Sequence, residues 1–191
     1  MVPRFILASG SPRRRQLLKK AGYEFEIVSP PGEEVAHAWL TIRELTLCNA
    51  RRKASRVAET LPDAVVLAAD TLVTIDGRVL GKPADIYDAV RILRSLSGRT
   101  HEVWTAVFIR HAARRKSHSF QEISRVRFRK LSDRAIRDYL AKVNPLDKAG
   151  AYAAQGHGTE IIEQIEGSYS NVVGLPMEAT TRALRDFGIT P

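Results

Sequence analysis

Two short segments contain residue types that could bind and hydrolyse a phosphate chain, and the first is Ser9-Gly10-Ser11-Pro12-Arg13-Arg14. Ser11 is a favoured helix N-cap and Pro12 a favoured first helical residue, so a helix should begin here. The unpaired N–H groups at a helix start attract anions, and guanidinium groups match the geometry of phosphate oxygens. The segment therefore predicts a phosphate site, although a surface helix with solvated arginines would have the same spacing.

The second segment is Asp70-Thr71, which follows the apolar run Val65–Ala69. A carboxylate at the end of a core strand lies at the sheet edge where ligand clefts of α/β proteins often open. This placement suits a catalytic Asp70, or one that binds magnesium together with substrate phosphates. The alternative is that Asp70 only caps a turn through backbone hydrogen bonds.

Four other charged side chains could assist such a site. Lys82 follows a predicted hairpin, and a lysine binds phosphate as a point charge. Lys53 lies beside the apolar stripe of a long predicted helix, one turn after Asn49. Glu33 and Glu34 lie in a turn-like stretch and could bind a metal ion. Each of these charges is also compatible with an ordinary solvated surface position.

Several function classes are disfavoured. The histidines show no zinc-ligand spacing with cysteines or carboxylates. The sequence also lacks a Walker loop, a G-x-S-x-G elbow and a Rossmann glycine fingerprint. The net charge of +9 favours an anionic partner. The basic cluster at residues 110–116 is interpreted as a solvated hairpin tip rather than a nucleic-acid patch, because no aromatic residues interleave with it for base stacking.

The composition is that of a folded globular protein, with 44% hydrophobic and 27% charged residues in 191. We expect one domain spanning residues 1–191. The apolar runs are far shorter than the roughly 20 residues needed to span a bilayer, so no membrane segment is expected. The apolar stretch near Phe5 is too short for a signal peptide, and a single cysteine, Cys48, suits a reducing compartment. A cytoplasmic location is therefore expected.

Apolar periodicity and turn residues predict alternating strands and helices. The expected strands are Phe5–Ala8, Glu24–Val28, Val65–Ala69, Leu72–Ile75, Arg78–Leu80, His101–Ile109 and Phe120–Phe128. The expected helices are Pro12–Ala21, Thr41–Leu61, Ile86–Leu96, Ser132–Lys142 and Pro176–Phe187. Asn171–Pro176 is interpreted as a strand-to-helix junction. Because hairpins interrupt the alternation, we predict a mixed central sheet flanked by helices.

An ordered series of short motifs resembles the Maf family of nucleoside triphosphate pyrophosphatases along the whole chain. The motifs are SGSPRR at residues 9–14, KA at 53–54, AADT at 68–71, LGKP at 80–83, LSG at 96–98, DKAGAY at 147–152, QG at 155–156 and NVVGLP at 171–176. The resemblance implies an inosine triphosphatase-like fold with two lobes around a cleft, a homodimer and a divalent metal cofactor, Mg or Mn. It also implies the reaction, in which water attacks the α-phosphorus of a nucleoside triphosphate substrate and pyrophosphate leaves.

Matching positions carry the family's roles onto this sequence. Asp70 would be the proton acceptor and a metal ligand, with Glu33 or Glu34 as a second ligand. The triphosphate would contact Ser9, Arg14, Lys53 and Lys82.

Three positions that help to separate the family's substrate branches are Arg13, Thr71 and Gln155. This set resembles the branch that hydrolyses dTTP and UTP, which typically also accepts modified pyrimidine nucleotides. Ala153 and Ala154 depart from the more common residues before Gln155, so the base pocket can differ in shape. Two alternatives remain at this stage, namely a 7-methyl-GTP pyrophosphatase of the same family and a nucleic-acid-binding regulator of septum formation.

Overall fold

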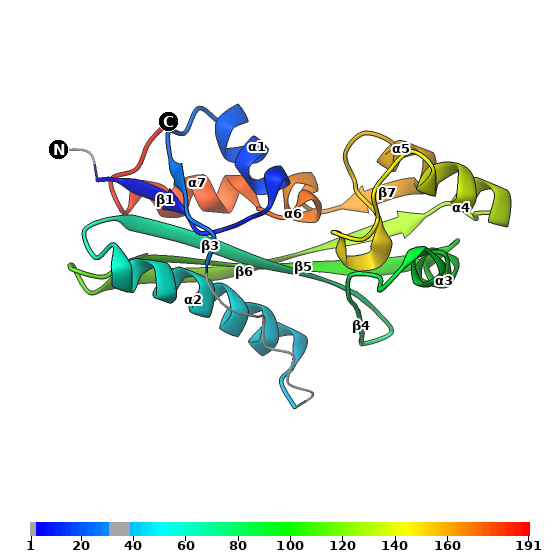
Figure 1. Ribbon diagram of the computed structural model, residues 1–191, viewed down its shortest axis with the longest axis horizontal. Helices are drawn as coiled ribbons and strands as arrows, with labels where there is room; N and C mark the ends of the chain where they lie inside the picture. The colour runs from blue at the N-terminus through cyan, green and yellow to red at the C-terminus, as the bar shows by residue number, and fades with distance from the viewer. Residues whose placement is uncertain (1–2, 31–38) are drawn as a thin grey trace. The chain divides into compact units, whose positions relative to one another are not determined.

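The computed structural model describes residues 3–30 and 39–191 (Figure 1). The strands are β1 (Phe5–Leu7), β2 (Glu26–Ile27), β3 (Val65–Ile75), β4 (Arg78–Leu80), β5 (Thr100–His111), β6 (Lys116–Phe128) and β7 (Ile162–Glu166). The helices are α1 (Pro12–Lys20), α2 (Ile42–Thr60), α3 (Ile86–Leu96), α4 (Asp133–Leu140), the 3-10 helix η1 (Ala149–Ala151), α5 (Gly158–Ile161), α6 (Tyr169–Val173) and α7 (Met177–Arg185).

The sheet is mixed, as predicted. Its strand order is β2-β1-β3-β5-β6-β7, and β4 pairs with β3. β1 runs parallel to both β2 and β3, whereas β4 is antiparallel to β3 and β7 is antiparallel to β6. The predicted class of a mixed sheet flanked by helices is therefore confirmed.

The chain forms two compact units. Unit 1 contains residues 1–70, 105–122 and 174–191, and unit 2 contains residues 71–104 and 123–173. Strands β3, β5 and β6 each contribute residues to both units. The two units agree with the two lobes that the sequence resemblance implied, and the cleft between lobes remains a prediction.

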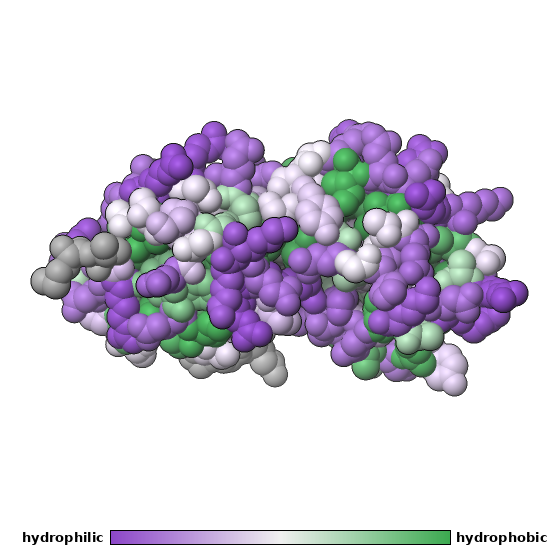
Figure 2. All heavy atoms as spheres, turned by 90° about the horizontal axis from the view of Figure 1, so that it is seen from above, coloured by the Kyte–Doolittle hydropathy of each residue, from purple (hydrophilic) through white to green (hydrophobic). Residues whose placement is uncertain are grey.

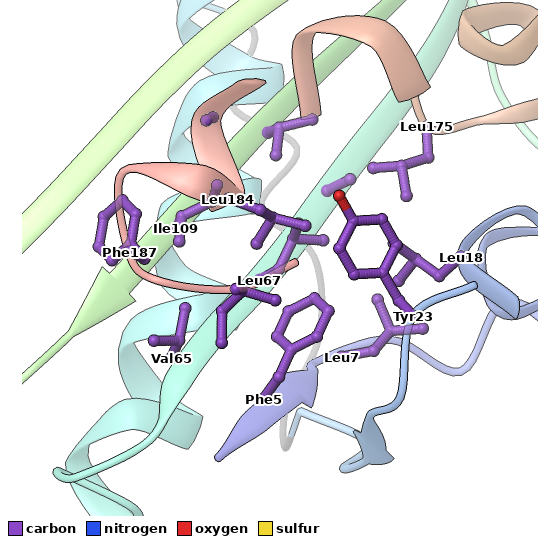
Figure 3. Packing of buried hydrophobic residues seen from close by; sticks show 14 residues of the cluster. Phe5, Leu7, Leu18, Tyr23, Val65, Leu67, Ile109, Leu175, Leu184 and Phe187 are labelled. Carbon is purple, nitrogen blue, oxygen red and sulfur yellow. The ribbon is translucent and has the colours of Figure 1, made fainter. Parts of the chain in front are cut away.

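In unit 1, side-chain alternation along β3 separates two apolar layers. Val65 and Leu67 pack with residues of α1 and α7, and Figure 3 shows this cluster, which includes the rings of Phe5 and Tyr23. Val66 and Ala68 point to the opposite face and pack with residues of α2. Figure 1 shows α2 on one side of β3, with α1 and α7 on the other. Burying one Leu or Val side chain contributes about 1.5–3 kcal/mol, so these layers fix α2 firmly against the strand.

Helix α2 begins where its sequence provides a complete cap. The Thr41 hydroxyl accepts a hydrogen bond from the backbone N–H of Glu44, and the Glu44 carboxylate accepts one from the backbone N–H of Thr41. This capping box satisfies two N–H groups at the helix start. The buried residues Ala54, Val57 and Ala58 follow at helical spacing and form the face that packs on β3.

Unit 2 contains two amphipathic helices that pack on each other, α3 and α4. The Asp85 carboxylate caps α3 at the N–H of Asp88, and the Ser132 hydroxyl caps α4 at the N–H of Ala135. Both caps lie at the starts of helices that the sequence predicted. Helix α4 buries the side chain of Tyr139, which is 1% exposed.

The structure corrects three details of the predicted elements. Asp70 was expected after the end of a strand, but β3 continues through it to Ile75. Residues 171–173, interpreted as part of a strand-to-helix junction, belong to helix α6. Strand β7 was not predicted, because Ile162–Glu166 is short and its two isoleucines are three residues apart, so the segment lacks the alternation typical of a strand. Pairing with β6 supplies the backbone hydrogen bonds that select the strand conformation.

Hydrophilic residues cover most of the surface that Figure 2 shows. Large exposed hydrophobic side chains in the described part of the chain include Trp39 at 77% and Tyr87 at 83% exposure. Across residues 3–30 and 39–191, no helix has both the length and the apolar character that crossing a membrane requires.

Candidate functional site

Asp70 is a buried carboxylate directed toward α2. Val66 and Ala68 face α2, and side chains two residues apart on a strand share a face, so Asp70 continues this row. Its side chain is 4% exposed. A buried charge is costly unless it is paired and hydrogen-bonded, so the partners of Asp70 decide whether this position is stable.

Lys53 and Asn49 of α2 supply those partners. Lys53 Nζ lies 2.6 Å from Asp70 Oδ1, and Asn49 Nδ2 lies 3.4 Å from Asp70 Oδ2. The two residues are one helical turn apart, so both reach the same carboxylate. The Lys53 side chain is 17% exposed, so its ammonium group keeps some contact with solvent while it compensates the negative charge of the buried Asp70 carboxylate. Asn49 lies on the helix face predicted for Lys53, and the four-residue spacing between them is the signal in the sequence that indicates a shared role.

The start of α1 lies beside the same strand. β1 and β3 run parallel with Leu7 opposite Leu67, and the Ala8 N–H donates to the Leu67 carbonyl. β1 then ends, and the chain turns through residues 8–11 into α1 while β3 continues to Asp70. The loop before α1 therefore opens at the carboxyl end of β1, next to the β3 segment that carries the carboxylate.

The Ser9 hydroxyl organises this loop. Its Oγ accepts hydrogen bonds from the Ser11 backbone N–H at 3.2 Å and from Arg14 Nη1 at 3.3 Å. With its oxygen used as an acceptor, the hydroxyl proton is the group that Ser9 can offer to a phosphate oxygen. Ser11 does occupy the N-cap position, but its side chain makes no capping hydrogen bond with the described residues, which differs from the expectation.

Arg14 is held in a fixed orientation at the first turn of α1. Its Nε donates to the carbonyl of Gly174 at 2.8 Å, while its Nη1 contacts Ser9. Arg13 and Arg14 are both half-buried. Because a guanidinium carries five N–H donors in a rigid fork, two protein contacts orient Arg14 and leave it suited to phosphate recognition.

The remaining predicted site residues divide between the second unit and the undescribed segment. Thr71, Lys82 and Gln155 belong to unit 2. Glu33 and Glu34 lie outside the described residues. The structure thus brings Lys53 to Asp70 and Arg14 to Ser9, and the roles of all these residues remain predictions.

A metal ion would find compatible chemistry at Asp70. Magnesium prefers oxygen ligands and commonly uses one or two carboxylates together with substrate phosphates. Each carboxylate oxygen can accept more than one bond, so the contacts from Lys53 and Asn49 are compatible with a metal ion on the same group. Within residues 3–30 and 39–191, no three His, Cys, Asp or Glu side chains gather as a metal-binding group.

In unit 2, the loop that carries Gln155 follows a buried aromatic group. His101 Nε2 lies 2.7 Å from the hydroxyl of Tyr152, and both rings pack edge-on against Phe128. Burial lowers the pKa of His101 to about 4, so its imidazole is neutral near pH 7. Burial also raises the pKa of the Tyr152 hydroxyl. The contact between His101 and Tyr152 was not predicted, because the two residues are 51 positions apart and no periodic pattern in the sequence links them.

Comparison with known proteins gives a consistent result. The sequence model of a family described as Maf-like protein matches residues 4–187. A dTTP/UTP pyrophosphatase of Carboxydothermus hydrogenoformans is 44% identical over 185 residues, covering 97% of this chain and 99% of the relative. A dTTP/UTP pyrophosphatase of Bacillus cytotoxicus is 45% identical over 184 residues, covering 96% of this chain and 95% of the relative.

A solved structure of the Ham1 protein of Staphylococcus aureus shows a weaker likeness. It has a TM-score of 0.48 and 14% identity, and the match covers 65% of this chain and 71% of that chain. Similarity at this level carries no conclusion about fold or activity.

Proposed function

The chain belongs to the Maf-like protein family, and from this membership together with the Asp70 geometry we propose that it is a nucleoside triphosphate pyrophosphatase acting on dTTP and UTP. The observation that carries the proposal is the buried Asp70 carboxylate, paired with Lys53 and placed beside the loop before α1. A rigid carboxylate next to an anion-binding helix start combines a proton acceptor with a phosphate site.

In the proposed reaction, water attacks the α-phosphorus and Asp70 accepts the proton that the water loses. The new bond joins the water oxygen to the α-phosphorus, and the bond to the bridging oxygen of the β-phosphate breaks. Pyrophosphate leaves, and the nucleoside monophosphate retains the added oxygen. The oxygens of the phosphate chain are bound by Ser9, Arg14 and Lys53. These oriented hydrogen-bond donors stabilise the negative charge that develops on the phosphate oxygens during attack.

We propose that a divalent cation, Mg or Mn, is required, with Asp70 and Glu33 or Glu34 as its protein ligands. The oxygen-rich donor set and the high charge of a triphosphate support this assignment. When bound, the cation would neutralise phosphate charge and make water more acidic. The protein's own contribution is to fix the carboxylate through Lys53 and Asn49.

The preference for dTTP and UTP is proposed on two grounds. The relatives that match this chain along nearly their whole length are called dTTP/UTP pyrophosphatases. The residues Arg13, Thr71 and Gln155 also resemble that branch of the family. Substrate-binding roles for Thr71, Lys82 and Gln155 rest on this resemblance. A preference for 7-methyl-GTP has no comparable support.

We further propose that the enzyme is a cytoplasmic homodimer and that nucleic acid is not its partner. The family resemblance supports the dimer, and the single Cys48, which suits a reducing compartment, supports the location. Size-exclusion chromatography with light scattering would determine the oligomeric state, and a monomer at micromolar concentration would contradict the first part.

The decisive experiment for the proposed function is hydrolysis in ¹⁸O-labelled water. The purified protein is incubated with dTTP, UTP or 7-methyl-GTP and with Mg²⁺ or Mn²⁺, and the products are analysed by mass spectrometry. We expect monophosphate and pyrophosphate, with the label in the monophosphate. Label in pyrophosphate, or release of orthophosphate, would overturn attack at the α-phosphorus. Higher kcat/KM for 7-methyl-GTP than for dTTP would overturn the substrate assignment.

A further inference from the structure

The segment of unit 2 that carries Gln155 has an unusual backbone. Gly150, Ala151 and Gly156 all have positive φ, at 72°, 61° and 63°. For Ala151, which has a Cβ, this conformation costs about 1–2 kcal/mol. Such a conformation persists only where the surroundings impose it. The contacts that impose it should therefore be found around the intervening residues 152–155, here called the Gln155 loop.

Hydroxyl groups of two tyrosines hold the backbone of the Gln155 loop directly. The hydroxyl of Tyr139 accepts a hydrogen bond from the Ala153 N–H at 3.0 Å. The hydroxyl of Tyr169 donates to the Ala154 carbonyl at 3.4 Å. Tyr139 is anchored in helix α4 and is 1% exposed, whereas Tyr169 is 50% exposed. The shorter and buried Tyr139 contact is therefore the stronger constraint.

Both ends of the loop are fixed as well. At its start, the Tyr152 hydroxyl contacts His101 Nε2 at 2.7 Å. At its end, the Gln155 carbonyl accepts from the Gly158 N–H at 3.3 Å. A Cβ at Gly158 would lie 2.6 Å from the Ala153 carbonyl oxygen, so the backbone passes too closely there for any residue except glycine. Every residue from 152 to 155 thus has a backbone or side-chain contact that restricts it.

We propose that Tyr139 is a positioning residue for substrate binding: its buried hydroxyl holds the Gln155 loop in the conformation from which Gln155 contacts the substrate. The inference rests on the proposed function, because that proposal gives Gln155 its substrate contact. Tyr139 acts through the loop backbone at Ala153, two residues before Gln155. In this proposal it does not contact the reacting atoms. Its loss should therefore weaken substrate binding and leave the chemical step unchanged.

The test is a Tyr139→Phe substitution, which removes one hydroxyl and keeps the buried ring. We expect the KM for dTTP to rise about fivefold, the size of one lost hydrogen bond, while kcat stays within about twofold. Tyr169→Phe should raise KM by about twofold, because its longer and exposed contact is weaker. Tyr87→Phe is the matched control, since Tyr87 is 83% exposed, and it should leave both constants unchanged.

A double-mutant cycle separates positioning from general destabilisation. If Tyr139 acts through Gln155, adding Tyr139→Phe to a Gln155→Ala variant should change KM less than about twofold. Independent, multiplying effects would overturn the inference, as would a Tyr139→Phe enzyme that loses kcat and keeps its KM. Circular dichroism melts show the temperature range over which each variant is folded, and KM is measured within the range in which Tyr139→Phe is folded.

Measuring the wild-type enzyme in the same assay distinguishes failure of the proposed function from failure of the positioning role of Tyr139. An inactive wild-type protein overturns the proposed function and this inference with it. An active wild-type protein whose Tyr139→Phe variant has an unchanged KM overturns the positioning role alone.

Discussion

Asp70 in unit 1 and Gln155 in unit 2 are positioned by different means. Asp70 lies on a regular strand, and its partners Lys53 and Asn49 lie one turn apart on a regular helix. Gln155 lies on an irregular loop, which is held by tyrosine hydroxyls that contact its backbone, Tyr139 foremost. Regular elements place a side chain through their own periodicity, whereas an irregular loop requires a separate contact for almost every residue.

The two regions also differ in charge. The Asp70 region is built from an ion pair beside an arginine-bearing helix start. The region before Gln155 is built from aromatic groups that are neutral near pH 7, since burial lowers the pKa of His101 to about 4 and raises the pKa of the Tyr152 hydroxyl. We therefore expect changes in the first region to affect catalysis most, and changes in the second to affect stability and binding.

The largest expected effect is that of Asp70→Asn. Removing the proton acceptor should lower kcat by about a thousandfold, within the range for loss of general base catalysis. In the absence of a divalent cation, the Kd for dTTP should stay equal or fall, since the substitution removes a negative charge near an anionic ligand. Calorimetric titration with a non-hydrolysable dTTP analogue measures Kd, and steady-state assays measure kcat.

Asp63→Asn is the matched control for this change, because Asp63 is an exposed carboxylate in the same unit. It should retain wild-type kcat and Kd. If Asp70→Asn raised this Kd in proportion to its loss of kcat, the carboxylate would hold the substrate rather than activate water.

The second prediction concerns His101 and pH. Burial lowers its pKa to about 4, from an ordinary value near 6.5, so the unfolded chain binds the proton more strongly. The stability of the neutral form is fully present above about pH 6.5 and is lost as the pH falls toward 4, at a cost of up to about 3 kcal/mol. Urea unfolding at pH 7 and pH 5 measures this loss.

His101→Gln sharpens the pH prediction. Glutamine can keep a hydrogen bond to Tyr152 but cannot be protonated, so the variant should lose less stability than the wild type between pH 7 and pH 5. Equal losses in the two proteins would show that other groups cause the acid sensitivity. We expect the kcat of the variant at pH 7 to remain close to that of the wild type.

The smallest expected effect is that of Gly158→Ala. The added Cβ would lie 2.6 Å from the Ala153 carbonyl, so the loop must shift, at a cost of about 1–2 kcal/mol of unfolding free energy. Gly81→Ala in the same unit is the control, because its Cβ would meet no atom within 4 Å. Urea midpoints that fall equally in both variants would contradict the close approach at Gly158.

The Asp70 region was largely predictable from sequence. The apolar run before Asp70, the Ser-Pro helix start and the lysine on the α2 stripe each follow from local residue types, and the ordered motifs identified the family. Asn49 could have been included, because a four-residue spacing from Lys53 places both on one helix face. The sequence did not predict that β3 continues through Asp70, since a charged residue in a strand becomes favourable only when Lys53 lies opposite it.

The sequence by itself determined the mixed α/β class, the caps of α3 and α4, and the family, because these depend on local propensity and on ordered motifs. Tertiary structure alone decided that Tyr139 contacts Ala153 and that His101 meets Tyr152. These pairs are 14 and 51 residues apart in the chain, and no periodic pattern links them. Only the packing of helices and strands brings such groups within hydrogen-bonding distance. The contacts around Gln155 therefore could not be predicted from the sequence.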